Sequence, residues 1–137
     1  MRVKRILSPL LTVVLVAGCS SRFAGEYRSD VRLVPGKTES TERGYTLAEV
    51  RERLADKPRT LSLRRDGRYV LRQGDSTNEG NWRVEGKTLV LHDDTSNGNP
   101  IVRELQMQRR LDLGEGGEII DRDAYSYYNL EEFYTRQ

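Results

Sequence analysis

The fold is decided by two stretches, LSLRRDGRYVL at residues 61–71 and GNWRVEGKTLVL at residues 80–91. In each, apolar and polar residues alternate on both sides of a turn dipeptide. The first has Leu61, Leu63, Asp66-Gly67, Tyr69 and Leu71, and the second has Trp82, Val84, Glu85-Gly86, Leu89 and Leu91. Alternation with period two places the apolar side chains on one face of a strand, and a dipeptide such as Asp-Gly favours a tight hairpin turn. The sequence therefore predicts two consecutive β-hairpins, with Trp82 in the core.

Weaker versions of this pattern continue on either side. We expect further short strands at Phe23–Asp30, around Leu111–Leu113, at Glu118–Asp121 and around Glu132–Arg136, whereas Ile101–Arg109 alternates less cleanly. Turn-forming residues predict loops at Val31–Arg43, Gln73–Gly80 and Asp93–Pro100, and a bend at Gly114–Gly117. A helical turn is expected before the last strand. Seven or eight short strands joined by turns predict a mainly β fold, a small antiparallel meander closed into a barrel. A β-sandwich is the alternative.

One helix interrupts the strand pattern, at about residues 46–57. Thr46 and Glu49 have the spacing of a capping box, which satisfies free backbone donors at a helix N-terminus. Three apolar residues then follow at helical spacing, namely Leu47, Val50 and Leu54. Pro58 ends the helix. The narrow apolar stripe predicts that the helix packs on the sheet or covers a barrel mouth.

Residues 1–18 are typical of a secretory signal peptide. Arg2, Lys4 and Arg5 form a basic start, and the short apolar run Ile6–Val16 follows. This run is too short to span a bilayer, which takes roughly 20 residues. A basic start, a short apolar run and small residues after it are the marks of a segment removed on export.

The small residues precede the only cysteine of the chain, in the motif LVAGC at residues 15–19. This motif resembles the lipobox of bacterial lipoproteins. The resemblance implies that Cys19 is lipidated, that residues 19–22 form a short tether and that residues 23–137 form the exported domain. An ordinary signal peptide with a chance cysteine is the alternative. By the same resemblance, Ser20 rather than aspartate after the cysteine indicates the outer membrane, with the domain facing the periplasm.

Charge excludes some partners. The whole chain has a formal net charge of +2. Removing the signal peptide takes away three basic residues and no acids, which leaves the mature chain near neutrality. A protein without a strong net charge has no long-range field to attract nucleic acid or anionic lipid, and we expect no nucleic acid as a partner.

The strand rhythm carries a second resemblance. The motif L-x-L-x-x-D-G-x-Y-x-L at Leu61–Leu71 and the motif G-x-W-x-x-x-G-x-x-L-x-L at Gly80–Leu91 look like those of small lipocalin-like barrels of bacterial lipoproteins. The N-terminal barrel of the copper-resistance and envelope-stress lipoproteins is one of these. That barrel carries a C-x-x-C motif, whereas this chain has no cysteine after Cys19. A copper or redox role is therefore not implied, and a shared barrel does not imply a shared function.

No group of residues predicts catalysis, a metal site or a cofactor. His92-Asp93-Asp94 places an imidazole beside two carboxylates, but His92 is the only histidine and no nucleophile or further ligand is evident. The loop Asp93–Asn99 lacks the spacing of a calcium loop. The acids between Glu115 and Asp123 are interpreted as exposed turn residues, and the arginines around Asp66-Gly67 as a solvated face.

The C-terminal stretch is rich in aromatic residues. We expect an exposed aromatic surface that contacts a partner, formed by Tyr125, Tyr127, Tyr128 and Tyr134. The predicted function is that of a non-enzymatic envelope lipoprotein that binds another envelope component. The alternatives are a lipocalin-like carrier of a small apolar ligand, and a periplasmic inhibitor or immunity lipoprotein.

Overall fold

The computed structural model describes residues 22–40 and 44–137. The predicted signal peptide and the lipidation site Cys19 lie outside these residues, so both remain predictions. Nine strands and one α-helix are found in the described part. In chain order they are β1 (Gly25–Leu33), α2 (Leu47–Asp56), β2 (Arg59–Leu63), β3 (Arg68–Gln73), β4 (Ser76–Glu85), β5 (Thr88–Ser96), β6 (Asn99–Pro100), β7 (Gln108–Leu113), β8 (Ile119–Asp121) and β9 (Leu130–Arg136). Short 3₁₀ turns lie at Arg103–Leu105 and Ser126–Tyr128.

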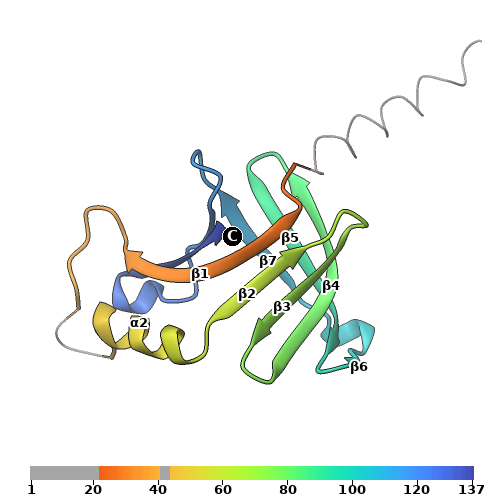
Figure 1. Ribbon diagram of the computed structural model, residues 1–137, viewed down its shortest axis with the longest axis horizontal. Coiled ribbons are helices and arrows are strands. Elements are labelled where there is room, and N and C mark those ends of the chain that lie inside the picture. Colours follow the sequence, from red (N-terminus) through yellow and green to blue (C-terminus); the bar gives the residue numbers. More distant parts are fainter. Residues whose placement is uncertain (1–21, 41–43) are drawn as a thin grey trace, which may run out of the picture.

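The strands form a closed antiparallel barrel, as predicted (Figure 1). Eight strands follow one another around the ring in chain order, because β9 pairs with β1 and β4 pairs with β5. The short β6 is an extra strand that pairs with the end of β5. Closure satisfies the backbone of both would-be edge strands, so the meander presents no open edge along most of its length. The sandwich alternative is therefore wrong.

The predicted hairpin turns form where the dipeptides stand. Asp66-Gly67 lies between β2 and β3, where the Gly67 amide donates to the Arg64 carbonyl and the Asp66 carboxylate accepts from the Arg68 amide. Gly67 has a φ of +86°, a conformation that costs glycine little. The turn after Glu85 joins β4 to β5, with Glu85 opposite Thr88.

Large side chains from the alternating positions fill the barrel. The buried cluster contains Tyr27, Leu61, Leu63, Tyr69, Leu71, Trp82, Leu89, Leu91, Leu111, Ile119 and Tyr134. Trp82 lies in this core as predicted, and its indole N–H donates to the Arg64 carbonyl at 2.8 Å. Gly80 lets β4 and β5 approach closely, because a Cβ there would clash with the His92 carbonyl and would lie 2.9 Å from the Tyr69 ring.

The helix closes one end of the barrel. Thr46 caps it by accepting a hydrogen bond from the Glu49 amide, and the buried Val50 and Leu54 pack with Val31 and Leu130. β2 pairs with β1 only as far as Arg28, so α2 lies beside the remainder of β1 (Figure 1). There the Arg51 side chain donates to the Val31 carbonyl, a bond that a neighbouring strand would otherwise provide.

Three predicted loops are shorter than expected. The start of the first, Val31–Leu33, belongs to β1, where it pairs with β9. In the second, only Gly74 and Asp75 form the turn, and Ser76–Gly80 extends β4. In the third, Asp93–Ser96 extends β5. The polar side chains of Ser76–Glu79 and Asp93–Ser96 hid two of these strand ends from a prediction based on alternation, whereas Val31 and Leu33 continue the alternation of β1.

The last stretch follows the prediction. A 3₁₀ turn at Ser126–Tyr128 ends at Asn129, whose φ of 61° reverses the chain. The closing strand β9 begins at Leu130, two residues earlier than expected.

Candidate functional site

The most unusual surface feature is an apolar loop between β6 and β7. Val102, Leu105 and Met107 are 62%, 69% and 71% exposed. They lie within six residues around the 3₁₀ turn Arg103–Leu105. We call Val102–Met107 the apolar tip. Isolated exposed leucines are ordinary, but clustered large apolar side chains on a surface indicate a contact site.

Hydrogen bonds hold the base of the apolar tip. His92 Nε2 donates to Gln106 Oε1, 2.7 Å away, and the Gln106 side-chain amide donates to the Ile101 carbonyl at 3.0 Å. The Ile101 amide donates to the Asp94 carbonyl, and the Asp93 amide donates to the Met107 carbonyl. The exposed side chains are therefore presented on a loop fixed to β5 at both of its ends.

His92, Asp93 and Asp94 make separate contacts in the described part of the chain. His92 is used by the apolar tip. Asp94 accepts two hydrogen bonds from the Arg68 guanidinium, which hold the pKa of its carboxyl below the ordinary value. Burial raises the pKa of Asp93. The part that this motif takes in fixing the loop was not foreseen from the sequence.

Tyr134 does not belong to an exposed aromatic surface, so that part of the prediction is wrong. Its side chain is 1% exposed, because β9 turns it toward the barrel interior. The hydroxyl hydrogen-bonds the carboxylate of Glu132, also buried. Tyr125 is half-buried against the α2 cluster.

The other two tyrosines lie at the helix-covered end. Tyr127 is 62% exposed, and its ring meets that of Tyr128 edge-on with 5.2 Å between centroids. Tyr128 packs edge-on against Tyr45 and lies over Gly44, where a Cβ would clash with its ring. Tyr128 therefore connects the 3₁₀ turn to the chain preceding α2, which leaves Tyr127 as the accessible member of the predicted set.

A buried polar cluster lies inside the barrel near this end. Arg59 donates to both carboxylate oxygens of Glu132, at 2.9 and 3.1 Å, and to Gln73. The Glu132 side chain is fully buried, and burial raises its pKa. The same burial raises the pKa of Tyr134. The charged groups are satisfied by one another, which indicates a structural role.

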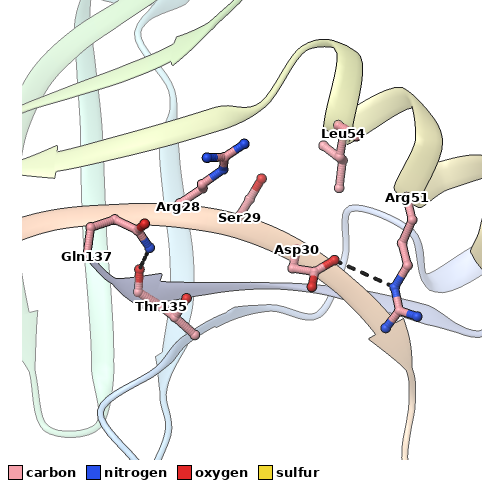
Figure 2. Close-up of a pocket in the computed structure, with 8 residues that line it drawn as sticks. Arg28, Ser29, Asp30, Arg51, Leu54, Thr135 and Gln137 are labelled. Atoms are coloured by element: carbon pink, nitrogen blue, oxygen red, sulfur yellow. Dashed lines mark hydrogen bonds and ion pairs between the residues drawn. The ribbon is translucent and has the colours of Figure 1, made fainter.

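Figure 2 shows a shallow hollow between β1, α2 and the end of β9. It encloses about 270 Å³. Arg51 crosses its rim, 3.7 Å from the Asp30 carboxylate, and Leu54 faces it from the helix. The Ser29 hydroxyl is buried there without a hydrogen-bond partner in the described part of the chain. The hollow lies where α2 takes the place of β2 beside β1.

The acidic stretch is dispersed. Glu118 pairs with Arg32 at 3.1 Å, and the Asp121 carboxylate accepts from the amides of Asp123 and Ala124. Within residues 22–40 and 44–137, no three potential metal ligands are grouped. Those residues also contain no helix with the length and hydrophobicity of a membrane span.

No protein-family model, curated protein or solved structure matches the chain. Its function must therefore be argued from the geometry of its own residues. Among those residues, the apolar tip is the feature that folding alone does not explain, because its side chains add nothing to the core.

Proposed function

We propose that this protein is a lipid-anchored, non-enzymatic module of a bacterial envelope that binds another envelope protein through the apolar tip. The observation that carries the proposal is the exposure of Val102, Leu105 and Met107 on one short loop. Keeping these side chains in water is unfavourable by about 25 cal/mol per Å² of apolar surface, a cost that a partner would remove on binding.

The fixed base of the apolar tip supports this proposal. A loop that is already ordered loses little conformational entropy when it binds, so more of the contact energy appears as affinity. The hydrogen bonds of Gln106 with His92 and with the Ile101 carbonyl provide that order. Methionine is also enriched at protein interfaces, because its flexible thioether adapts to irregular surfaces.

The position of the apolar tip supports it as well. β1 begins at one end of the barrel, and the loop after β5 lies at the other end, since alternate strands run in opposite directions (Figure 1). If Cys19 carries the lipid, the apolar tip points away from the membrane toward other proteins. An inhibitor or immunity lipoprotein would use the same surface, and the identity of the captured partner separates these cases.

Photo-crosslinking in living cells tests the proposal. A photoreactive residue at Leu105 should capture a protein, whereas the same residue at Glu52, exposed on α2, should capture much less. Leu105→Ser together with Met107→Ser should weaken the association at least about tenfold, because interface hot-spot residues each contribute more than 1 kcal/mol.

Tyr127→Ser is the matched control for loss of an exposed large side chain elsewhere. If the variant with both Leu105→Ser and Met107→Ser associates as strongly as the parent protein, the apolar tip is not the contact site. Loss in Tyr127→Ser alone would move the contact to the predicted tyrosine surface.

A further inference from the structure

We infer that the barrel stands on the anionic surface of the bilayer, and that Arg22, Arg65 and Lys87 contact lipid phosphates. This rests on the proposed anchor at Cys19. The inference concerns the barrel end that we call the anchor-side end, formed by the start of β1 and the turns at residues 64–67, 86–87 and 114–118.

Topology brings these segments together. β1 begins at the end where β2 passes into β3, β4 into β5 and β7 into β8. Arg22 and Phe23 share a surface hollow with Gly116 and Gly117, and a second hollow is lined by both Lys87 and Gly114. The start of the described chain therefore lies among the turns of this end.

Arg136 fixes the beginning of the described chain to the barrel. Its guanidinium donates to the carbonyls of Arg22 and Ala24, at 2.8 and 2.9 Å, and to the Tyr27 hydroxyl. The folded body thus reaches back to Arg22, three peptide units after Cys19. Three units extend at most about 11 Å, so a lipid on Cys19 holds this end close to the headgroups.

The charges at the anchor-side end favour an anionic surface. Its acids Asp66, Glu85 and Glu118 are paired with arginines, at 2.6, 2.8 and 3.1 Å. Arg65 and Lys87 are exposed and have no ion-pair partner among the described residues, and Arg22 lies over the Phe23 ring. Two exposed acids of this end, Glu26 at the start of β1 and Glu115 in the last turn, have no ion-pair partner among the described residues. Arg22, Arg65 and Lys87 outnumber them by one, so a small basic excess remains.

A bilayer is the occupant that these observations favour. A basic residue near an anionic membrane gains about 1 kcal/mol, which is roughly a fivefold change in the population of the contacting state. The anchor removes the entropic cost of bringing the barrel to the surface, so even a few such contacts can orient it.

The only tryptophan of the chain offers a built-in probe. Trp82 donates from its indole to the Arg64 carbonyl, so it lies beneath the turn that carries Arg65. The protein would be extracted from its own envelope, its intact mass measured, and then placed in phosphatidylglycerol vesicles containing lipids with spin-labelled headgroups. Quenching of tryptophan fluorescence then reports approach of this end to the headgroups.

We expect strong quenching that weakens as salt rises and in vesicles of phosphatidylcholine alone. Arg65→Glu with Lys87→Glu should lower the contacting population at least about fivefold for each charge removed. Arg72→Glu is the matched control, since Arg72 is exposed near the other end of the same hairpin. The Trp82 fluorescence of this variant should be quenched as strongly as that of the parent protein.

The outcomes separate the two proposals. A mass without lipid on Cys19 would refute the anchor and this inference with it. A lipidated protein whose Trp82 is unquenched, or equally quenched in both charge-reversed variants, would overturn the orientation and leave the anchor intact. Neither result depends on whether the apolar tip captures a partner.

Discussion

At the scale of single residues, the buried pair of Glu132 and Arg59 is the contact most sensitive to change. Glu132→Ala removes the partner of a guanidinium that is largely enclosed by the barrel. We expect the free energy of unfolding to fall by about 3–5 kcal/mol, because an uncompensated buried charge remains. Urea denaturation followed by circular dichroism measures this change.

Glu85→Ala is the control, because Glu85 bridges Arg83 and Arg110 on the exposed surface. It should change the midpoint of unfolding little, since exposed ion pairs contribute little to stability. Equal midpoints for the two variants would mean that the buried pair is not important for stability.

The alternation of residues in the last strand could have predicted that Glu132 is buried. Glu132 stands midway between Leu130 and Tyr134, so any strand that buries those two residues also turns Glu132 inward. No local pattern names its partner, however. Arg59 lies 73 residues away, and only the pairing of β9 with β1 and of β1 with β2 brings the two together.

At the scale of elements, α2 can be tested apart from the barrel wall. Leu54 is 6% exposed and packs with Val31 and Leu130. Leu54→Ala should lower the free energy of unfolding by about 2–4 kcal/mol, through lost apolar contact and the cavity left behind. Hydrogen exchange should accelerate first in α2, because this helix is not part of the hydrogen-bonded sheet that forms the barrel.

Glu52→Ala on the exposed face of the same helix should leave both quantities near those of the parent protein. If Leu54→Ala accelerates exchange equally in β3 and β4, the helix does not open separately, and the assignment of α2 as a cover is wrong.

Elements were predictable where pattern and turn chemistry agree. The hairpins around Asp66-Gly67 and Glu85-Gly86, the capped helix and the closing strand all formed as expected. The first half of β4 was missed because Ser76–Glu79 is entirely polar. These residues pair with Arg72 and its neighbours in β3 near a turn that projects into water, so backbone pairing holds them without apolar burial.

The exposure of the apolar tip could not be predicted, because its residues are apolar and such residues are normally buried. Val102, Leu105 and Met107 look like residues of an irregular buried strand, and sequence does not state exposure. Gln106 contacts His92 and Ile101 at the base of this segment. His92 lies close to Gln106 only because β5 pairs with β7, and a local sequence pattern does not contain that pairing.

At the scale of the whole molecule, acid stability should depend on two arginine-bound carboxylates. Hydrogen bonds from Arg68 and Arg32 lower the pKa values of Asp94 and Glu118 below their ordinary 3.8 and 4.5. The folded state thus binds fewer protons at these sites than the unfolded state, so they stabilise the fold above those ordinary values. That contribution is lost as the pH falls through the lowered values.

Asp94→Asn with Glu118→Gln should therefore reduce the loss of stability below about pH 4, measured as the shift of the urea midpoint relative to the parent protein. Comparison with the parent is needed because burial raises the pKa of Glu132, which acts in the opposite direction. Parallel curves for the two proteins would show that these carboxylates do not govern acid unfolding.

The filled interior counts against a carrier of a small apolar ligand, and this can be tested directly. Trp82, Leu89, Leu91 and their neighbours occupy the space that an apolar ligand would need. The parent protein should therefore show no saturable binding of a fluorescent fatty acid.

Leu91→Ala should create a cavity that admits a small probe such as benzene, at a cost of about 2–5 kcal/mol in stability. Leu105→Ala, which removes an exposed side chain of the same kind, should do neither. Saturable, stoichiometric binding by the parent would require the core to rearrange around a ligand, and a carrier would then replace the binding module as the better explanation of this barrel.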